Sequence, residues 1–245
     1  MEDKALLSTE VASGAEKAEL LIVIPAYNEA ENIERVVNHL TANFPQYDYV
    51  VVNDGSRDET AAICQRNGYN LLNLPVNLGL VGAFQAGLKY ADKYGYQYAV
   101  QLDGDGQHRP EYLESMIKKM EEGYDIVIGS RFVGEKKPFT MRMLGSNLIE
   151  MAIRFTTGVN IKDPTSGMRM FSKRMIREFA SGLNYGPEPD TVSYLIRQGA
   201  RVAEVPVIMD ERILGVSYLT PVNAMRYMLK MLISILLIQN FRKRR

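Results

Sequence analysis

The stretch LLIVIPAYNE, residues 20–29, sets the pattern on which the rest of the chain is built. It opens with the apolar run LLIVI, which ends at Pro25. Such a run is too short for a helix and suits a strand that is buried on both faces. Polar residues come next, and the spacing beyond them predicts a helix over residues 29–41. A buried strand, a polar loop and a helix make one unit of an alternating α/β fold.

The same unit recurs along the chain. Further strands are predicted at residues 49–52, 70–74, 98–102 and 125–129, and further helices at residues 58–66 and 80–94. Alternation at this spacing predicts a mostly parallel central sheet wrapped by helices. Ligands of such sheets bind beyond the carboxyl ends of the strands. Polar clusters stand at those ends, at residues 27–29, 53–56 and 103–108.

Composition excludes several classes of protein. The 245 residues include 29 basic and 29 acidic side chains, so the chain lacks the basic surplus that nucleic-acid binding requires. A single cysteine, Cys64, excludes an intramolecular disulfide framework and a multi-cysteine zinc site. It is also compatible with a reducing cytoplasm.

The chain is expected to hold one catalytic-type domain between two end segments. Residues 1–19 form an acidic leader that lacks the features of a secretory signal, and we expect it to be disordered. The catalytic domain is expected over residues 20–217, and residues 218–245 form a separate C-terminal segment.

The sharpest local feature is DGDGQ at residues 103–107. Asp103 and Asp105 stand two residues apart where an apolar strand ends, so both carboxylates can point to one side. Two close carboxylates repel unless a cation lies between them, which predicts a hard divalent ion that also contacts phosphate oxygens. The alternative is a solvated Asp/Gly turn. Asp54 has a similar alternative, because it stands before a predicted helix and could cap it.

Six motifs in order resemble glycosyltransferase family 2. They are PAYNE at 25–29, NDGSRD at 53–58, NLG at 77–79, DGDGQH at 103–108, GSRF at 129–132 and DPTSG at 163–167. The dolichol-phosphate-mannose synthase-like branch and its bacterial polysaccharide relatives are the most similar. The resemblance implies a Rossmann-like GT-A fold, a nucleotide diphosphate sugar as donor, Mg²⁺ or Mn²⁺ as cofactor, and inversion at the anomeric carbon.

The resemblance also implies roles for individual residues. The expected nucleotide-binding residues are Pro25, Tyr27, Glu29, Asp54, Asn77, Gly79 and Asp103. The expected ligands of the metal and the diphosphate are Asp103, Asp105 and Gln107. In the lipid-phosphate branch an arginine and a downstream Arg-x-x-x-Ser hold the acceptor phosphate, which implies this role for Arg131, Arg142 and Ser146. A surface cation is the alternative for Arg142.

The catalytic base is left open. Transfer to a hydroxyl requires a base, whereas an acceptor phosphate is already ionised and requires none. The candidates are Asp163, Glu188 and Asp190, beside Asp105, which acts with the metal. Asp190 could instead cap a helix. A cation near the aspartates would stabilise the charge that gathers on the leaving diphosphate.

The C-terminal segment contains an apolar stretch over residues 219–238, long enough to cross a bilayer as a helix. Arg226 and Lys230 lie inside it, and each disfavours a spanning helix by roughly 2.5–3.5 kcal/mol. With Ser234 they are expected to form a polar stripe opposite an apolar face. We therefore expect an amphipathic helix that lies on an anionic membrane or pairs with a second copy, with Arg242–Arg245 meeting lipid headgroups. A core helix of a soluble protein is the alternative.

These observations predict an inverting, metal-dependent hexosyltransferase on the inner face of the cell membrane. Its acceptor is expected to be a lipid-linked polyprenyl phosphate or a cell-surface polysaccharide. Tyr218 stands where the synthase branch often has lysine, which favours a polysaccharide-type enzyme with a UDP-sugar, and GDP-mannose next. One alternative is a sugar-phosphate nucleotidyltransferase, which would carry a glycine-rich basic loop in place of PAYNE. The other is a non-catalytic, membrane-tethered nucleotide-binding subunit.

Overall fold

A computed structural model of the chain describes residues 19–135, 137–138, 140–181, 186, 188–210 and 221–241. Its centre is a seven-stranded sheet in the order β3-β2-β1-β4-β6-β5-β7. The strands are β1 (Leu20–Ala26), β2 (Asp48–Asn53), β3 (Leu71–Asn73), β4 (Tyr98–Gln101), β5 (Ile126–Ser130), β6 (Arg169–Ser172) and β7 (Val202–Pro206). The α-helices are α1 (Ile33–Asn43), α2 (Thr60–Arg66), α3 (Gly79–Lys93), α4 (Leu113–Glu121), α5 (Met141–Thr157), α6 (Lys173–Ser181), α7 (Pro189–Arg197) and α8 (Pro221–Leu236).

The sheet is parallel except for one strand. β1 pairs in parallel with β2 and β4, and β5 pairs in parallel with β7, whereas β6 runs antiparallel to both β4 and β5. The prediction of a mostly parallel sheet is therefore confirmed. Because β6 runs the other way, its first residue, Arg169, lies at the same sheet edge as the carboxyl ends of its neighbours.

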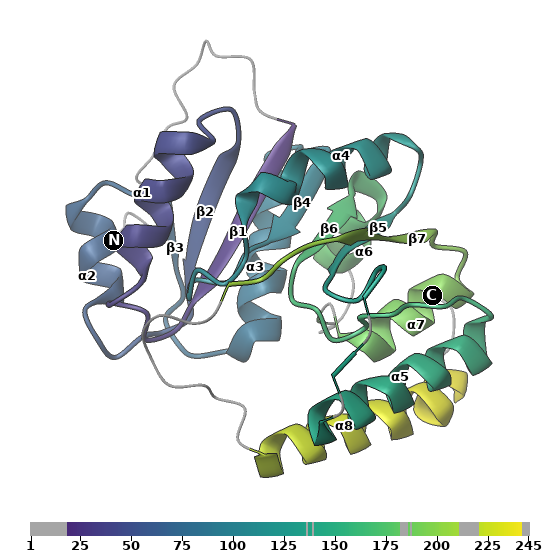
Figure 1. Cartoon of the computed structure of the whole chain (residues 1–245). Helices are drawn as coiled ribbons and strands as arrows, with labels where there is room; N and C mark the ends of the chain where they lie inside the picture. Colours follow the sequence, from purple (N-terminus) through teal and green to yellow (C-terminus); the bar gives the residue numbers. More distant parts are fainter. Residues whose placement is uncertain are drawn as a thin grey trace.

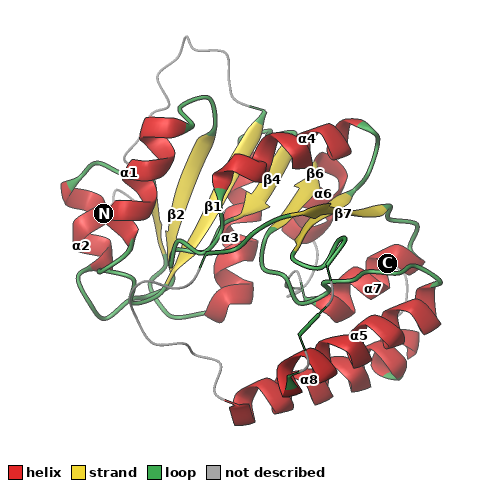
Figure 2. Cartoon of the chain, viewed as in Figure 1, coloured by secondary structure: helices red, strands yellow, loops and turns green. Residues whose placement is uncertain are grey.

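Helices cover both faces of the sheet (Figures 1 and 2). On one face α1, α2 and α4 pack in a core that takes Leu20, Ile22 and Ile24 from β1. On the other face α3 and α6, together with α5, α7 and α8, share a core with Leu21 and Val23. β1 is thus buried on both faces, as its apolar run predicts.

The helix predicted over residues 29–41 begins only at Ile33. Residues 28–30 instead donate backbone hydrogen bonds to the loop that follows β2. The local spacing of helix-forming residues contains no information about such contacts with a distant segment. The helix predicted over residues 80–94 agrees with α3 to within one residue at each end.

α8 contacts α5 and α7 (Figure 1). Gly145 lets α5 and α8 approach closely, because a Cβ there would lie 1.6 Å from the Met228 sulfur. The predicted polar stripe of α8 is wrong for Ser234, whose hydroxyl is buried and donates to Asp190 of α7 at 2.6 Å. The side of α8 that carries Ser234 therefore faces the protein. Residues 1–18, 211–220 and 242–245 lie outside the described residues, and with them Tyr218 and the basic end.

Candidate functional site

The loops that follow β1 and β2 are hydrogen-bonded to each other. Asn28 lies in the left-handed backbone region, with a φ of 56°. Its backbone N–H donates to the Ser56 hydroxyl at 3.0 Å, and its side-chain oxygen accepts from the Arg57 N–H at 2.9 Å. These two bonds fix the loop of PAYNE against the loop of NDGSRD.

A second set of bonds lies beside the first. The Glu29 N–H donates to the Thr60 hydroxyl at 2.9 Å, and the Ala30 N–H donates to the Asp58 carboxylate at 3.1 Å. Burial opposes ionisation of Asp58, but hydrogen bonds from Thr60 and Ala30 outweigh burial and hold the pKa of this carboxyl below its usual value. The Glu29 carboxylate accepts from the Asn32 amide at 2.8 Å, so it is held in place before any ligand binds.

Asp54 connects the loop after β2 to the start of α3. Its carboxylate accepts from the Leu78 N–H at 2.6 Å, and its carbonyl accepts from the Asn77 amide at 3.1 Å. The alternative of capping the following helix, α2, is wrong, because Asp54 bonds residues that precede α3 instead. Gly55 has a φ of 63°, and a Cβ on it would lie 2.7 Å from the Asn77 backbone nitrogen. This turn therefore requires glycine.

Apolar side chains project around these loops. Tyr27 is 43% exposed, and Val76, Leu78 and Leu80 are each more than half exposed. Exposed apolar and aromatic surface next to fixed polar groups suits a flat base, which stacks on such surface and takes hydrogen bonds at its rim. The predicted residues Tyr27, Glu29 and Asp54 all come from these joined loops.

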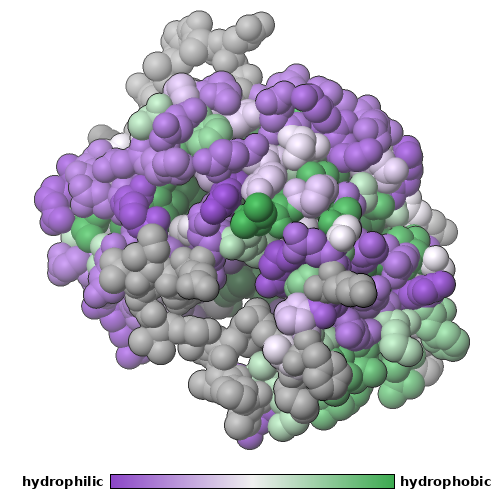
Figure 3. Space-filling view, in the orientation of Figure 1, coloured by the Kyte–Doolittle hydropathy of each residue, from purple (hydrophilic) through white to green (hydrophobic). Residues whose placement is uncertain are grey.

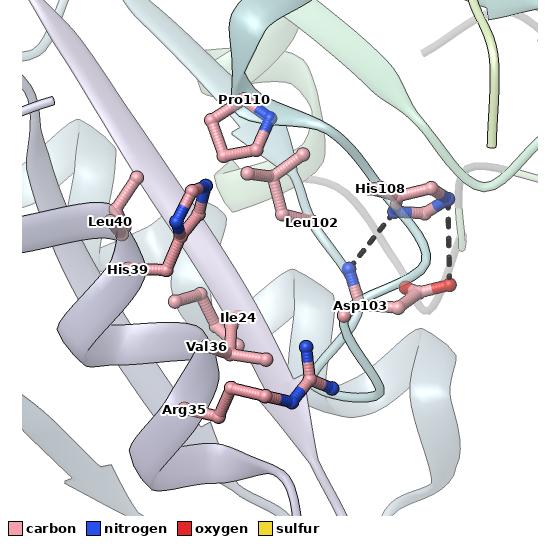
Figure 4. A pocket seen from close by; sticks show the side chains of 10 residues that line it. Ile24, Arg35, Val36, His39, Leu40, Leu102, Asp103, His108 and Pro110 are labelled. Carbon is pink, nitrogen blue, oxygen red and sulfur yellow. Dashed lines mark hydrogen bonds and ion pairs between the residues drawn. The ribbon is translucent and has the colours of Figure 1, made fainter. Parts of the chain in front are cut away.

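The DGDGQ loop extends from β4 at the same edge. Asp103 accepts a hydrogen bond from the Gln101 amide at 2.7 Å. His108 Nδ1 accepts from the Asp103 backbone N–H at 3.0 Å, and His108 Nε2 lies 3.8 Å from the Asp103 carboxylate (Figure 4). The ring therefore carries its proton on Nε2, facing the carboxylate.

Asp105 is nearly buried, and its carboxylate accepts from the Gln107 N–H at 3.0 Å. The Gln107 amide nitrogen donates to the Asp210 carbonyl at 3.1 Å, which leaves the predicted ligand role to the amide oxygen. Gly104 lies against β1, since a Cβ there would lie 3.1 Å from the Pro25 carbonyl oxygen. The loop is thus placed by close backbone contact with PAYNE.

These residues fit a divalent cation that shares its ligands with a substrate. Within the described ranges no group of three or more His, Cys, Asp or Glu side chains is arranged to hold a metal. Asp103 and Asp105 supply two carboxylates at the end of one strand. Mg²⁺ is commonly held by one or two carboxylates together with substrate phosphates. The pair therefore suits a metal that arrives with a diphosphate.

A small cavity of about 50 Å³ lies between α1 and the DGDGQ loop, lined by Arg35, His39 and Leu102 among others (Figure 4). It is far smaller than the few hundred cubic ångströms of a cofactor site. The Asp103 carboxylate points away from His39 and toward His108 (Figure 4). The Asp103 carboxylate therefore faces a different side of the loop from the one toward His39.

Arg131 and Asp163 form a buried pair beyond β5. Arg131 Nε and Nη2 donate to the two Asp163 oxygens at 2.7 and 2.8 Å. The Asp163 side chain is fully buried, whereas that of Arg131 is 25% exposed. The Asp163 N–H in turn donates to Glu204 at 2.8 Å. This geometry disfavours Asp163 as a base and makes it the group that orients Arg131, whose exposed part faces out of the pair.

The second predicted acceptor element, Arg142 with Ser146, lies on the first turns of α5. Ser146 is completely buried, and its hydroxyl has no hydrogen-bond partner in the part of the chain that the structure describes. The Arg142 side chain lies outside the described groups. A buried hydroxyl without a partner is unfavourable, and a bound ligand would relieve it.

Glu188 and Asp190 lie at the start of α7. The Asp190 carboxylate accepts from the Thr191 N–H, from Ser234 and from Gln239. Asp190 thus links α7 to the C-terminal helix, which disfavours a role as base, and it lies in the first turn of α7 rather than at the N-cap, which is Glu188. Burial, with the nearby charge of Asp190, raises the pKa of the Glu188 carboxyl, and Lys230 offsets part of that shift.

Comparison with known proteins decides the family. Residues 21–179 match the family Glycosyl transferase family 2. The chain belongs to glycosyl transferase family 2.

Named relatives of this family 2 chain fall in the branch predicted from its motifs. It is 32% identical to a polyprenol monophosphomannose synthase of Mycolicibacterium smegmatis over 86% of this chain and 84% of the relative. It is 31% identical to an undecaprenyl-phosphate mannosyltransferase of Micrococcus luteus over 81% of this chain and 86% of the relative. A UDP-N-acetylglucosamine–dolichyl-phosphate N-acetylglucosaminyltransferase of Methanococcus voltae is 30% identical over 77% of this chain and 84% of the relative. The chain is therefore a glycosyltransferase of the dolichol-phosphate-mannose synthase-like branch, and the nucleotidyltransferase alternative is set aside.

Solved structures confirm the predicted GT-A fold. Glucosyl-3-phosphoglycerate synthase from Mycobacterium tuberculosis, in complex with phosphoglyceric acid, superposes with a TM-score of 0.67. The match covers 92% of this chain and 81% of that chain at 18% identity. A complex of the same enzyme with Mn²⁺, uridine diphosphate and glucosyl-3-phosphoglycerate gives a TM-score of 0.64 at 20% identity.

One more buried residue lies at this sheet edge, outside the motifs of the sequence. Arg169 is only 4% exposed, begins β6 at the same edge as the predicted residues, and donates to the Pro164 carbonyl at 2.6 Å. The predicted residues follow the carboxyl ends of parallel strands, whereas Arg169 stands at the amino end of an antiparallel strand. Its position in the sequence, directly after DPTSG-Met, was the available signal.

Proposed function

We propose that this glycosyltransferase moves a hexose from a nucleoside diphosphate sugar to the phosphate of a polyprenyl phosphate. The observation that carries the proposal is the Arg131–Asp163 pair. It holds a partly exposed guanidinium at the sheet edge that also carries Asp103 and Asp105. Arginine's planar donors match phosphate oxygens. The relatives support the proposal, since three are named for transfer to polyprenol, undecaprenyl or dolichyl phosphate.

The donor side is formed by the joined loops after β1, β2 and β4. The base would stack near Tyr27 and the diphosphate would lie beside Asp103 and Asp105. A divalent cation bound there would stabilise the charge that develops on the departing diphosphate. The relatives' names include both mannose and a UDP-sugar, so UDP-sugars and GDP-mannose are both candidate donors.

The acceptor side would present the phosphate as the nucleophile. A phosphate oxygen is ionised at neutral pH and attacks the anomeric carbon without a base. Asp163 then orients Arg131, and Asp190 links helices, without either taking a proton. Attack from the side opposite the leaving diphosphate inverts the anomeric carbon. A polysaccharide acceptor would instead present a hydroxyl and require a base.

The test is a transfer assay with product identification. The purified protein is incubated with vesicles containing undecaprenyl phosphate, Mn²⁺ or Mg²⁺, and UDP-glucose, UDP-N-acetylglucosamine or GDP-mannose in turn. One donor is expected to yield a glycosylated lipid phosphate by mass spectrometry, together with free nucleoside diphosphate. Asp105→Asn is expected to lower turnover about 10²–10³-fold. Nucleoside diphosphate released only in the presence of a hydroxyl acceptor would contradict the proposal.

We also propose that the protein contacts an anionic membrane through a surface that we call the α5–α8 face. Among the described large apolar side chains that are exposed, most lie on these two helices and the turn after α8 (Figure 3). They are Leu144, Leu148, Met151, Phe155, Met225, Leu229, Ile233, Leu236, Leu237 and Ile238. None of the described helices is long and apolar enough to span a bilayer. A large exposed apolar patch of this kind is typical of an interaction surface.

Charge favours a lipid surface over a second copy. Exposed Arg154, Arg226 and Lys230 accompany the apolar residues, and α8 contains no acidic residue. The one acidic residue of α5, Glu150, accepts from Lys137 at 2.7 Å. A symmetric dimer through this face would bring these cations together without acidic partners, whereas anionic headgroups would attract each by about 1 kcal/mol.

Vesicle sedimentation tests this membrane contact. Phe155→Glu, at a side chain 85% exposed, is expected to weaken binding to phosphatidylglycerol vesicles, and high salt is expected to weaken it further. Ile208→Glu, which adds the same charge at an exposed position outside the two helices, is the matched control. A protein that ignores vesicles and sediments as a dimer that Phe155→Glu dissociates would show that a second copy covers the face.

A further inference from the structure

Arg169 has a donor that nothing in the described chain uses. The side chain is 4% exposed, and Nη2 donates to the Pro164 carbonyl at 2.6 Å. Its Nε has no hydrogen-bond partner among the described residues. Leaving a buried charged donor unsatisfied is among the more unfavourable arrangements in a folded protein. A group outside the described residues is therefore expected to accept from Nε.

The nearby carboxylates do not fill this role. Asp163 is engaged by both donors of Arg131. Asp103 accepts from the Gln101 amide and faces the His108 ring.

Glu188 is the remaining neighbour, and burial raises the pKa of its carboxyl. Burial also lowers the pKa of Arg169, yet a guanidinium stays protonated in proteins. Arg169 thus keeps a buried positive charge, and its Nε donor still lacks an acceptor among the described residues.

Arg169 lies between the two sides of the site. The titratable groups near it are Tyr227 of α8, Asp163 before β6, Glu188 before α7 and Asp103 after β4. Asp103 belongs to the donor side, and Asp163 orients the acceptor arginine. The guanidinium is therefore placed where a donor diphosphate and an acceptor phosphate would approach each other.

We propose that Arg169 is a phosphate-binding residue of the transfer site and that its buried Nε donates to a phosphate oxygen of a bound substrate. The inference rests on the proposed function. Its consequence is electrostatic: transfer to a phosphate brings two anionic substrates together, and a buried cation between them lowers their repulsion. The phosphate can come from the donor's diphosphate or from the polyprenyl phosphate, and the experiment separates these sources.

The direct test follows the Arg169 Nε–H resonance in ¹H–¹⁵N spectra of the full chain. The resonance is assigned by through-bond experiments and by its loss in Arg169→Lys. Wild-type protein is titrated with UDP, GDP and inorganic pyrophosphate with Mg²⁺, and separately with farnesyl phosphate. A downfield shift with UDP, GDP or pyrophosphate assigns Nε to the donor, and one with farnesyl phosphate assigns it to the acceptor. The proposal would be overturned if other resonances show that these probes bind the protein while the Arg169 Nε–H resonance shifts with none of them.

Substitution gives an independent readout. Arg169→Lys keeps the charge and removes the planar donors. It is expected to raise either the Kd for the nucleoside diphosphate or the KM for the polyprenyl phosphate at least ten-fold, and to leave the other within two-fold. Arg174→Lys is the matched control, because Arg174 makes a two-donor pair with Asp125 at the opposite sheet edge.

The outcomes also separate this inference from the function on which it rests. A wild-type protein that binds neither nucleoside diphosphate nor polyprenyl phosphate would refute both. A wild-type protein that transfers sugar normally, with a folded Arg169→Lys variant that matches it in every constant, would refute the role of Arg169 alone.

Discussion

The two sides of the transfer site are built differently. On the donor side, the loops after β1 and β2 satisfy one another: Asn28 binds Ser56 and Arg57, and Asp54 binds Leu78. On the proposed acceptor side, the buried Ser146 hydroxyl has no hydrogen-bond partner among the described residues, and neither does the Arg169 Nε, which lies between the two sides. The polar groups of the donor loops are thus hydrogen-bonded to one another before a ligand arrives. On the acceptor side, a buried polar group is expected to gain its partner only when a ligand binds.

One fold can thus accommodate two substrates in different ways. Fixed loops hold their donors and acceptors in place, so binding a nucleotide requires little rearrangement. Unsatisfied buried groups lower the stability of the free protein, and a ligand that satisfies them stabilises it by mass action. The acceptor side should therefore gain more order from its ligand than the donor side does.

Breaking the Arg131–Asp163 pair is expected to have the largest effect on stability. Asp163→Asn leaves the Arg131 charge without its carboxylate at a buried site. The free energy of unfolding is expected to fall by about 3 kcal/mol, the low end for breaking a buried pair, because Arg131 is partly exposed. Urea denaturation measures the change. Glu114→Gln, which breaks an exposed pair with Lys118, should leave the midpoint almost unchanged. Equal midpoints for Asp163→Asn and wild type would remove Asp163 as the group that orients Arg131.

The second prediction concerns the donor side. Gly55→Ala places a Cβ 2.7 Å from the Asn77 backbone nitrogen at a φ of 63°. Gly68→Ala, at a φ of 66° with no atom within 4 Å, imposes the backbone strain alone. Gly68→Ala is expected to cost about 1–2 kcal/mol of stability, and Gly55→Ala about 1 kcal/mol more. Calorimetric titration with UDP or GDP should show weaker binding only for Gly55→Ala. Unchanged nucleotide affinity there would contradict a donor site built on fixed loops.

Ser146 and Ser234 are both buried but differ in whether the hydroxyl has a hydrogen-bond partner among the described residues. Ser146→Ala removes a buried hydroxyl without a described partner and should leave stability equal or raise it by up to about 1 kcal/mol. Ser234→Ala removes a buried hydroxyl that donates to Asp190 and should cost about 1 kcal/mol. Only Ser146→Ala should raise the KM for polyprenyl phosphate. If Ser146→Ala instead destabilises the protein as much as Ser234→Ala, the hydroxyl has a structural partner and no acceptor role.

The smallest predicted effect is a pH dependence. The folded pKa of Glu188 is raised, so its protonated form is favoured in the native state. Stability from this group is present below the unfolded pKa and is lost as the pH rises through the folded value. Glu188→Gln should therefore gain stability relative to wild type as the pH increases through that window. Thermal unfolding across pH 4–8, compared with Glu178→Gln on the surface of α6, gives the difference. A difference that does not vary with pH would contradict burial of an ionisable Glu188.

The sequence predicted the elements that follow simple periodicity. LLIVI gave a strand buried on both faces, and the α/β alternation gave a mostly parallel sheet. The motifs also located the family and the donor loops, because those residues are contiguous. β6 could not be predicted in the same way, since RMFS is short and begins with a charge that only the assembled edge buries.

Pairings between distant residues were the harder part. Asp163 and Arg131 were proposed for separate roles, and the structure joins them over 32 residues of sequence. Ser234 was placed on a polar stripe by its helical spacing, but Asp190 draws it inward across 44 residues. In each case a buried hydrogen bond between distant segments determines where the side chain points, and the local sequence pattern does not reveal that bond.

Hydrogen–deuterium exchange tests the contrast between the two sides most directly. Exchange is measured on the free protein, with the nucleoside diphosphate and Mg²⁺, and with farnesyl phosphate. Farnesyl phosphate is expected to protect the first turns of α5 and residues 163–169 strongly. The loops at 28–30 and 54–60 should exchange slowly already in the free protein and change little with nucleotide. Strong nucleotide-induced protection of those loops, with no effect of bound farnesyl phosphate on α5 or on residues 163–169, would contradict this difference between the two sides.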